Sequence, residues 1–584
     1  MAKKYGFNNQ EIAKLLRDVA AALTLKNVSI FQIRAYETAA DAIEHSTAEV
    51  KDLWEEEKLD QVPGIGKNIQ SHLDELFKAG RVKHFEVITK GLPPVFFDLL
   101  EIPEIGPKTA KKIVDTGIKS IDDLRNKIEN GVLLERGFTE KTLANIFQGL
   151  SVALSEKGRI LLPIAFAHAE RILDNLKSSK DVLAVEALGS LRRRVATIGD
   201  LDFAVSSKHP EKVVGHFINM PDVIRVMNKG REKATVLLKS GFQADLLVGA
   251  PESFGAILQH FTGSKQHNIH LRGLAEERGY SISEHGVKDL KHNKLIEIPN
   301  EDRLYKLLNM QTPPPELRED TNEIDAALKY ELPKLVEYGS IKGDLHTHSD
   351  FPLEPSHGPG VNSIQEIVKK AIELNYEYIG ISDHSPSVSN HSEKEIINLI
   401  EKRTNFIEDI KYSGKSVRVI NGLEIDILPN GKLSVPDEAL KTLDYVIAGI
   451  HSSHRMEKDK MTQRILNALK NPYVDILAHP TGRLLNQRDS YDADWEPIFK
   501  FCAQNKKLLE INSFPDRLDL RDDLVRMAIG FGVKLIIDSD AHEVSQMENI
   551  KFGIAVARRG WATEEDIVNT WDWKKFSDWF NIKS

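Results

Sequence analysis

Short apolar segments alternate with helical stretches from residue 340 to the end of the chain, and this feature limits the possible folds most. The segments are YIGISD, VRVINGLEIDI, YVIAGIH, VDILAHP, KLLEINS and GVKLIIDSD. Continuous apolar strands are typical of sheets that are covered on both faces, and intervening helices connect such strands in parallel. The pattern therefore predicts an α/β barrel or an open parallel sheet.

Most of these segments end in a histidine, an aspartate, a glutamate or an asparagine. In GDLHTHSD, a spacing of two places His346 and His348 on one face of a strand. The other positions of this kind are His384, Glu424, His451, His479, Asp540 and His542. A lone histidine is usually structural, but polar residues at the ends of several barrel strands are typical of an active site. Imidazole and carboxylate groups without thiolates suit Zn²⁺, Mn²⁺ or Fe²⁺, so we expect a metal site here.

A second group of acidic residues lies where the spacing of apolar residues changes to a period of two, after a predicted helix at 151–176. VLAVEALGSL, IGDLDFAVSS, KATVLLKS and FQADLLV are the predicted strands of this α+β region. Asp200 and Asp202 lie two residues apart, so both point to one face of a strand, and Asp245 joins them if its strand is adjacent. Three convergent carboxylates need cations, and oxygen ligands of this kind suit Mg²⁺ in phosphoryl transfer.

Groups that suit a triphosphate precede these aspartates. Gly189 and Ser190 supply a tight turn and a hydroxyl, and the arginines at 192–194 supply guanidinium groups. An Asp-x-Asp pair alone is common in turns and on solvated strand edges. Together with the third aspartate, the hydroxyl and the arginines, the pair predicts a metal-dependent nucleotide site.

Two similar segments lie near the N-terminus, VPGIGKNI at 62–69 and IPEIGPKTAKKI at 102–113. In each, a glycine turn opens a helix, so backbone N–H groups can face a phosphate oxygen. This arrangement predicts sequence-independent DNA binding of the helix-hairpin-helix type, although two plain helical hairpins remain an alternative. The predicted DNA-binding residues are Gly64, Gly66, Lys67, Gly106, Lys108 and Lys111.

The composition excludes several classes of protein. A chain of 584 residues is long enough for three or more domains. The only cysteine, Cys502, excludes an intrachain disulfide and a zinc site built on several thiolates. The net charge of −9 means that nucleic-acid binding must come from local basic clusters or backbone amides. The sequence shows no secretory signal and no membrane-spanning run, so we expect a cytoplasmic protein without a membrane partner.

Residues 1–335 resemble the family X DNA polymerases of the nucleotidyltransferase group. The shared motifs are the Gly-Ser pair, the arginines, Gly-Asp-x-Asp, the later strand aspartate and HFTGSKQHNIHLR at 260–272, in the same order. The resemblance implies that Asp200 and Asp202 bind two Mg²⁺ ions. It also implies that Asp245 binds the catalytic ion and helps to activate the primer 3′-hydroxyl.

The same resemblance implies nucleotide contacts outside the aspartates. Gly189, Ser190 and Arg193 match positions at the triphosphate of an incoming deoxynucleotide. The remaining matches pack beneath the sugar or contact the nascent base pair and the template: Phe261, Gly263, Asn268 and Arg272. His72 stands where animal relatives have the lysine that removes 5′-deoxyribose phosphate, and imidazole cannot replace an amine in that chemistry. We therefore do not expect this lyase activity.

Residues from about 340 to 584 resemble the PHP domain, a distorted (βα)7 barrel. Relatives of this kind hold three divalent metal ions and hydrolyse phosphoesters at DNA 3′ ends. They usually carry Ser-Asp-Gly after the His-x-His pair, whereas this chain has Ser356-His357-Gly358. His357 is therefore a candidate ligand in place of the aspartate. Arg483 is a candidate phosphate-binding residue, with a surface salt bridge as the alternative.

Together these patterns predict a multidomain chain. The expected parts are a helix-hairpin-helix domain at 1–85, a fingers-like helical domain with the second hairpin at 86–150, a nucleotidyltransferase palm at 151–255, a thumb and linker at 256–335, and a PHP barrel at 336–584. We expect a monomeric DNA polymerase that uses deoxynucleoside triphosphates to fill gapped or primer-template DNA in repair. The PHP site, with Mn²⁺ or Zn²⁺, would add a 3′–5′ exonuclease or 3′-end phosphoesterase activity. A histidinol-phosphate-type phosphatase and a non-enzymatic DNA-end scaffold are the competing interpretations.

Overall fold

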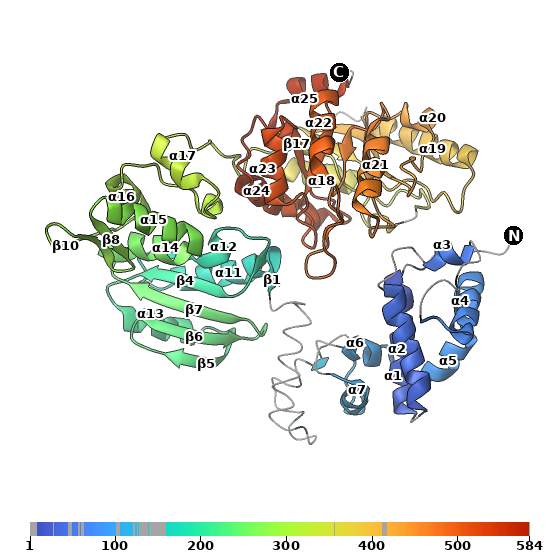
Figure 1. Ribbon diagram of the computed structural model, residues 1–584, viewed down its shortest axis with the longest axis horizontal. Helices are drawn as coiled ribbons and strands as arrows, with labels where there is room; N and C mark the ends of the chain where they lie inside the picture. The colour runs from blue at the N-terminus through green and yellow to red at the C-terminus, as the bar shows by residue number, and fades with distance from the viewer. Residues whose placement is uncertain are drawn as a thin grey trace. The chain divides into compact units, whose positions relative to one another are not determined.

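The structure is a computed structural model of the chain (Figure 1). It describes residues 7, 9–26, 28–44, 50–55, 59, 64–100, 105–120, 123, 124, 127, 133, 138, 159–355, 357–411 and 417–582. The chain forms two compact units, one from residues 1–158 with 452–456 and the other from residues 159–451 and 457–584. Across these described ranges, no helix combines the length and the apolar character needed to cross a membrane.

The N-terminal unit is helical where it is described. Its helices are α1 (Asn9–Leu25), α2 (Ile30–Glu44), α3 (Val50–Glu55), α4 (Lys67–Ala79), α5 (Lys83–Thr89), α6 (Pro94–Leu100) and α7 (Pro107–Val114). Leu16, Leu73 and Phe77 belong to one buried core, and Phe96 and Ile113 belong to a second. Each glycine segment therefore opens a helix that packs into its own core. The expected boundary at residue 150 lies outside the described residues.

The second unit begins with a five-stranded sheet in the order β2-β4-β7-β6-β5. Its strands are β2 (Ala184–Ala187), β4 (Leu201–Ser206), β5 (Val223–Lys229), β6 (Lys233–Leu238) and β7 (Gln243–Gly249), and a small second sheet pairs β1 (Ile160–Leu161) with β3 (Thr197–Ile198). The helices here are α11 (Leu162–Lys177), α12 (Gly189–Arg192) and α13 (Pro210–Ile218). β4 and β7 are parallel neighbours, and β6 pairs antiparallel with β7.

One helix differs from its predicted extent. The sequence predicts a helix over 151–176, but α11 begins at Leu162, and Ile160 and Leu161 form a short strand. Pro163 lies in the first turn of α11. Proline fits the first turn of a helix, because the N–H group that it lacks has no intrahelical partner there, so the helix begins beside it. Residues 151–158 lie outside the described residues.

A smaller α+β region follows the five-stranded sheet. It contains η2 (Pro251–Ser253), α14 (Phe254–Thr262), α15 (Lys265–Glu277), β8 (Tyr280–Ser283), β9 (Gly286–Asp289), β10 (Lys294–Ile296), α16 (Glu301–Leu307), η3 (Pro315–Leu317) and α17 (Glu323–Lys329). Leu271, Leu304 and Tyr305 are buried in its core. His267 is buried as well, between Glu323 at 2.5 Å and the Tyr305 hydroxyl at 3.0 Å, and fixes α15 against α16 and α17.

The C-terminal part is a sheet of seven parallel strands in chain order. The strands are β11 (Gly343–Asp344), β12 (Tyr378–Ile381), β13 (Arg418–Asp426), β14 (Tyr445–Gly449), β15 (Ile476–Leu477), β16 (Leu508–Asn512) and β17 (Leu535–Asp538). Their helices are α18 (Ile364–Glu373), α19 (Glu393–Lys411), α20 (Asp437–Leu440), α21 (Lys458–Leu469), α22 (Trp495–Asn505), α23 (Asp522–Gly530), η4 (Val544–Asn549), α24 (Ile550–Arg559), η5 (Val568–Thr570) and α25 (Trp573–Phe580). A parallel bridge between Thr347 and Ala541 brings the first and last strands together, so the sheet is a nearly closed barrel.

The barrel interior explains two of its glycines. A Cβ atom at Gly380 or Gly422 would lie 2.1 Å from the Tyr445 side chain, so only glycine leaves room for this buried tyrosine. The Tyr445 hydroxyl donates a hydrogen bond to the carbonyl of Leu345. The side chain thus connects β14 to the chain just after β11. The interior is a packed core, as in other barrels of this size, and the polar groups gather at the strand ends.

Candidate functional sites

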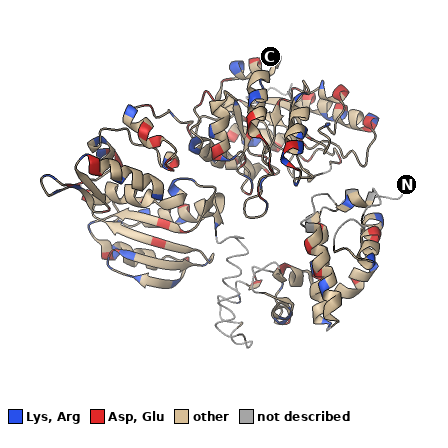
Figure 2. Cartoon of the chain, in the orientation of Figure 1, with Lys and Arg blue, Asp and Glu red and all other residues tan. Residues whose placement is uncertain are grey.

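The three aspartates of the middle region meet at one end of the five-stranded sheet. Asp202 on β4 pairs directly with Asp245 on β7, and Figure 2 shows acidic positions on these two strands. Asp200 precedes β4 and faces the same side, two residues away. The turn at Gly189 lies against the group, because a Cβ atom there would be 3.2 Å from Asp202 Oδ2 and the residue has a φ of +56°. The structure therefore brings the predicted carboxylates together beneath the Gly189 turn.

The negative charges of these aspartates repel one another. Burial, together with the charges of Asp200 and Asp245, raises the pKa of Asp202 to about 7. Asp245 accepts hydrogen bonds from Thr235 Oγ1 at 2.5 Å and from Gln243 Nε2 at 2.6 Å. Carboxylates held close in this way are stabilised by a bound cation, and their oxygen donors suit Mg²⁺.

The arginines after Gly189 have different partners. Arg192 donates hydrogen bonds to Thr262 Oγ1 and to Glu301 Oε2, both at 2.7 Å, so its guanidinium is part of the packing against α14 and α16. Arg193 donates to the Thr262 carbonyl and, from Nε, to Glu319 Oε1 at 2.9 Å. Arg194 lies over a phenylalanine ring at 4.5 Å. Arg193, which matches a triphosphate-binding position of the family, is thus held against Glu319 and the end of α14.

The remaining expected nucleotide contacts gather around α14 and α15. Asn268 Nδ2 donates to the His260 carbonyl at 2.8 Å, and Arg272 Nη2 lies 3.2 Å from His260 Nδ1. Phe261 packs against the ring of the same histidine. A Cβ atom at Gly263 would lie 3.1 Å from Arg193 Nη1, so this glycine lets the arginine approach the backbone closely. These contacts order the segment, but they do not test its role toward a nucleotide.

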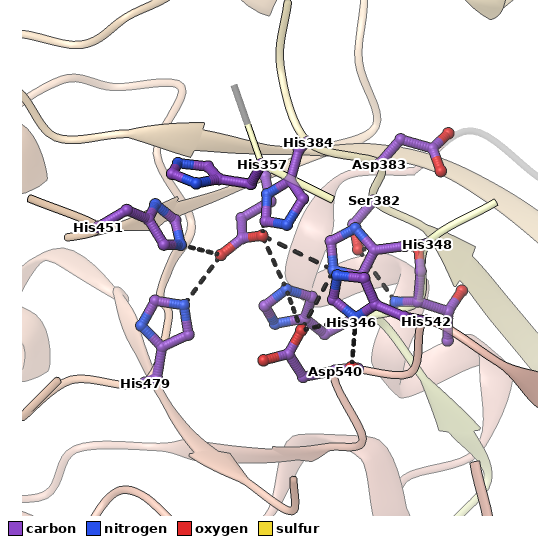
Figure 3. A network of polar contacts seen from close by, with 12 residues as sticks. His346, His348, His357, Ser382, Asp383, His384, His451, His479, Asp540 and His542 are labelled. Atoms are coloured by element: carbon purple, nitrogen blue, oxygen red, sulfur yellow. Dashed lines mark hydrogen bonds and ion pairs between the residues drawn. The ribbon is translucent and has the colours of Figure 1, made fainter. Parts of the chain in front are cut away.

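Every strand of the barrel contributes a polar residue at its carboxyl end, and Figure 3 shows the histidines and Asp540 of this cluster pointing toward one another. The residues are His346 and His348 after β11, His384 after β12, Glu424 on β13, His451 after β14, His479 after β15, Glu510 on β16, and Asp540 and His542 after β17. Parallel strands end at the same edge of a sheet, so the closed barrel gathers these groups on one face. All of them except His542 and His451 are buried.

Glu424 lies at the centre of this cluster. Its Oε1 atom is 3.0 Å from His479 Nε2 and 3.1 Å from His451 Nε2. Its Oε2 atom is 2.7 Å from His384 Nδ1 and 3.2 Å from His346 Nε2. One carboxylate therefore faces four imidazoles, which is a geometry for bridging metal ions.

Neighbouring ligand groups overlap along the cluster. Sets of three residues whose ligand atoms lie within 4.8 Å of one another are His348, His384 and His542; His346, His348 and Asp540; His384, Glu424 and His451; and His357, Asp426 and His451. Several buried atoms of the cluster lack a hydrogen bond of good geometry among the described residues, namely His346 Nε2, His348 Nδ1, Glu424 Oε2, His451 Nε2 and His479 Nδ1, although the first, third and fourth lie within ion-pair distance of another ligand. Buried polar atoms that lack hydrogen bonds are costly, so the donor set fits metal ions well.

The protonation states of two histidines and of the central carboxylate fit metal ligation, whereas the neighbouring carboxylates raise the pKa of His346 well above its usual value and that of His451 to about 9. Burial lowers the pKa of His348 well below its usual value, and burial with the nearby Arg517 lowers that of His479 to about 3. These rings are therefore neutral, the form that binds a metal. Burial would raise the pKa of Glu424, but His384 and its neighbours lower it far below the usual range, so the carboxylate is ionised.

Two carboxylates of the cluster were missed by the sequence prediction. Glu510 Oε1 lies 2.6 Å from His346 Nδ1, and Asp426 Oδ1 lies 2.6 Å from His451 Nδ1 and 3.1 Å from His357 Nε2. A carboxylate on the second nitrogen orients an imidazole ligand. Asp426 follows Glu424 by two residues on the same strand, and a period of two could have identified it. Glu510 ends a strand, as the predicted ligands do.

Arg483, the candidate phosphate-binding residue, is held by backbone contacts. Arg483 donates to the backbone carbonyls of Arg517 and Leu518 and fixes the loop that contains them. These contacts use its Nε and Nη2 atoms, and a role of Arg483 at a phosphate stays a prediction. Arg517 lies at the cluster itself, with Nε 3.5 Å from Asp540 Oδ2.

The two glycine turns of the N-terminal unit begin their helices as predicted. Gly66 and Gly106 are the residues before α4 and α7, both in extended conformation, and a Cβ atom at either would meet nothing within 4 Å. Gly64 differs, because its φ is +85° and a Cβ atom would lie 3.1 Å from Thr38. A pocket of about 800 Å³ adjoins the first turn and is lined by residues that include Tyr36, Gly64, Gly66, Lys67, His72 and His84. The rings of His72 and His84 stack in it at 4.9 Å.

Comparison with known proteins agrees with this architecture. Family models match a helix-hairpin-helix domain at residues 7–82, a SAM-like helix-hairpin-helix tandem at 96–151, a DNA polymerase beta thumb at 257–319 and a PHP domain at 344–514. A probable phosphatase of Thermoanaerobacter sp. (strain X514) is 28% identical over 239 residues, which are 39% of this chain and 89% of that protein. A probable phosphatase of Acetivibrio thermocellus is 28% identical over 218 residues, 35% of this chain and 83% of that protein.

A further relative spans almost the whole chain. The DNA polymerase/3′-5′ exonuclease PolX of Bacillus subtilis (strain 168) is 32% identical over 568 residues, which are 96% of this chain and 97% of that protein. The helical unit, the five-stranded sheet with its aspartates and the barrel with its histidines occur here in one chain. The chain therefore belongs to the PolX family, the family X DNA polymerases that carry a C-terminal PHP domain.

Proposed function

We propose that this chain is a template-directed DNA polymerase that fills gaps in DNA repair and also hydrolyses DNA from the 3′ end. The first activity belongs to the five-stranded sheet and the second to the barrel. The name of the Bacillus subtilis relative, which covers both regions, supports this pair of activities. The probable phosphatases support phosphoester hydrolysis by the barrel.

The direct pairing of Asp202 with Asp245 is the observation that carries the polymerase proposal. We assign Asp200 and Asp202 as ligands of two Mg²⁺ ions and Asp245 as a ligand of the catalytic ion. When bound, two such ions clamp the attacking and leaving oxygens of an in-line transfer. Arg193 and the Ser190 hydroxyl would bind the triphosphate. The segment with Phe261, Gly263, Asn268 and Arg272 would contact the sugar, the nascent pair and the template.

The overlapping ligand groups of the barrel carry the second proposal. We assign three metal ions, Mn²⁺ or Zn²⁺, to this cluster, and we assign His357 as a ligand because its Nε2 atom lies beside Asp426 and His451. Imidazole-rich sites suit these ions better than Mg²⁺. A bound ion of this kind lowers the pKa of its water toward ~7 and so supplies hydroxide at neutral pH. Arg517 lies where a phosphate oxygen at the cluster would find a positive charge.

DNA is the proposed partner of the N-terminal unit. The N–H groups at the starts of α4 and α7 can face phosphate oxygens at Gly66 and Gly106, with Lys67, Lys108 and Lys111 nearby. Basic and acidic residues are otherwise interspersed over the described elements (Figure 2), so a general positive surface does not attract DNA. We propose a cytoplasmic monomer without 5′-deoxyribose-phosphate lyase activity at His72.

One set of assays separates the proposed function from its two alternatives, a small-molecule phosphatase and a non-enzymatic DNA-end scaffold. The purified full-length chain would be given a gapped duplex with deoxynucleotides and Mg²⁺, a 3′-labelled strand with Mn²⁺, and histidinol phosphate. We expect template-directed addition and 3′-end hydrolysis. Hydrolysis of histidinol phosphate alone would indicate a small-molecule phosphatase. DNA binding with neither reaction would indicate a scaffold and would overturn the proposal.

A further inference from the structure

A carboxylate lies between two arginines that belong to different parts of the chain. Glu319 Oε1 accepts a hydrogen bond from Arg193 Nε and another from Arg559 Nη1, both at 2.9 Å. Arg193 is the arginine proposed to bind the triphosphate, whereas Arg559 is the last residue of α24 in the barrel. The nucleotide site and the barrel thus share one acceptor atom.

Arg559 is itself fixed by contacts on all sides. Its Nε and Nη2 atoms lie 2.8 and 2.7 Å from Asp522 Oδ2, at the start of α23. Its Nη1 atom also donates to the backbone carbonyl of Arg193 at 2.9 Å, just after α12. The side chain is only 10% exposed, so these charge-assisted bonds are poorly screened by water. The barrel therefore contacts both the side-chain partner and the backbone of Arg193.

Arg193 has donors left for a ligand. Its contacts with Glu319 and with the Thr262 carbonyl use one N–H each of Nε and Nη1. A guanidinium has five N–H donors in a rigid plane, so three are left by these two contacts. The anchors on Nε and Nη1 fix the plane of the guanidinium and leave both N–H groups of Nη2, which lowers the entropy lost when a phosphate binds.

We infer that Glu319 and Arg559 are positioning residues for nucleotide addition, and that the PHP barrel thereby sets the affinity of the polymerase site for deoxynucleoside triphosphates. Arg559 neutralises part of the Glu319 charge. Without it, Glu319 attracts Arg193 alone and competes with the triphosphate for that guanidinium. The carbonyl at the end of α12 also loses its partner. This inference rests on the proposed polymerase function.

The same interface offers a matched control. Arg558 precedes Arg559 on α24 and donates to Glu316 Oε1 and to the Val336 carbonyl, both at 2.8 Å. Its guanidinium lies over the Tyr338 ring at 5.2 Å. Arg558→Met therefore weakens the contact between the barrel and the preceding region without removing a contact of Arg193 or Glu319.

The test is single-nucleotide gap filling by the full-length chain at varied deoxynucleotide concentration. For Arg559→Met we expect KM for the nucleotide to rise about fivefold or more, the lower end of typical coupling between sites, with kcat little changed. Arg559→Lys should restore part of the loss, and Arg558→Met should leave KM unchanged. If Arg559 acts through Glu319, the double variant with Glu319→Gln should have a smaller KM increase than the product of the two single effects.

Thermal unfolding and 3′-end hydrolysis of each variant establish that the barrel is folded. An unchanged KM in a folded Arg559→Met chain, or an equal rise in Arg558→Met, would overturn the inference. If Arg559→Met does not fold, an unchanged KM in Glu319→Gln overturns it instead. A wild-type chain that adds no nucleotide refutes the proposed polymerase function, which is a separate result.

Discussion

The surroundings of single carboxylates in this chain shift their pKa values or hold them against imidazole rings. Asp202 is the clearest case, because burial and two like charges raise its pKa to about 7. In the barrel, Glu510 and Asp426 lie on the second nitrogens of His346 and His451 rather than facing solvent. At this scale the carboxylates differ between the sites: like charges raise the pKa of Asp202, whereas histidines lower the pKa of Asp426 below its usual range.

Asp202→Asn is expected to stabilise the metal-free protein and abolish nucleotide addition. A folded-state pKa above the unfolded value means that stability present at low pH is lost as the pH rises from about 4 to about 7. Asparagine does not ionise, so at pH 8 in EDTA the free energy of unfolding should rise by ~2 kcal/mol or more, since one pKa unit is about 1.4 kcal/mol. Denaturant unfolding and gap filling measure the two effects.

The pH dependence provides the control for this substitution. At pH 4 the carboxyl is protonated in both states, so Asn and Asp should give nearly equal stability. Asp200→Asn is the matched variant, and its exposed side chain predicts a smaller gain. A stabilisation of the same size at both pH values would show that the charge of Asp202 is not its source.

At the scale of elements, the ends of strands and helices place the proposed sites. β14 ends at Gly449, where a Cβ atom would lie 2.8 Å from His451 Cε1, 2.9 Å from His479 Cε1 and 3.1 Å from Glu424 Oε1. Position 449 must therefore lack a side chain for the ligands to come together. At Gly66 and Gly106 a side chain would meet no protein atom within 4 Å, so the lack of one leaves the helix starts open to a ligand.

Gly449→Ala is expected to damage the barrel site and spare the polymerase. The added methyl group displaces three ligands, so metal content and 3′-end hydrolysis should fall by about tenfold or more, in the range seen when metal ligands lose their support. Elemental analysis and release of a 3′ label measure this. Gly530→Ala on α23 is the control, because a Cβ atom there meets nothing within 4 Å. Full metal content in Gly449→Ala would contradict the predicted displacement.

Gly106→Val is expected to weaken DNA binding without unfolding the N-terminal unit. The φ of Gly106 is −78° and the space around it is open, so valine fits the fold but blocks the approach of a phosphate to the helix start. Binding to gapped DNA of any sequence should weaken similarly, because phosphate contacts carry no base information. Fluorescence anisotropy with several duplexes measures this.

Gly64→Val serves as the contrasting variant. Its φ of +85° and the nearby Thr38 make a side chain strained there, so we expect a lower melting temperature as well as weaker binding. Unaltered DNA affinity in a folded Gly106→Val protein would argue against the hairpin as a phosphate site. A change in sequence preference would do the same.

At the scale of the whole molecule, one chain carries two sites with different donor chemistry. The polymerase site offers carboxylate oxygens, and the barrel site offers mainly imidazole nitrogens. Their ligands come from separate sheets, and the contacts between the barrel and the preceding region include Arg559 with Arg193 and Glu319, and Arg558 with Glu316, none of which is a proposed metal ligand. The two chemistries should therefore be separable by mutation.

Asp245→Ala is expected to abolish nucleotide addition and retain 3′-end hydrolysis, because it removes a ligand only from the five-stranded sheet. His346→Ala is expected to abolish 3′-end hydrolysis and retain nucleotide addition. In the wild-type chain, Mn²⁺ or Zn²⁺ should support 3′-end hydrolysis better than Mg²⁺. Both reactions are followed on the same primer-template. Nuclease activity that survives His346→Ala but disappears with Asp200→Ala would place hydrolysis at the polymerase site.

The sequence alone was sufficient for features that depend on local periodicity. A spacing of two put Asp200 and Asp202 on one strand face, alternation of apolar strands and helices predicted parallel strands, and strand-end histidines indicated the barrel cluster. These rules work because the period of a strand and the direction of parallel strands follow from backbone geometry. β4 and β7 are neighbours, which is the condition under which Asp245 joins Asp200 and Asp202.

Only the tertiary structure decided which groups face one another across the closed barrel and between the barrel and the polymerase region. Glu510 reaches His346 from a strand 164 residues away, Arg517 rather than Arg483 lies at the cluster, and Arg559 reaches Arg193 across 366 residues. Such contacts leave no periodic pattern in the sequence. They depend on barrel closure and on the packing of whole elements, which bring distant side chains together only after the chain has folded.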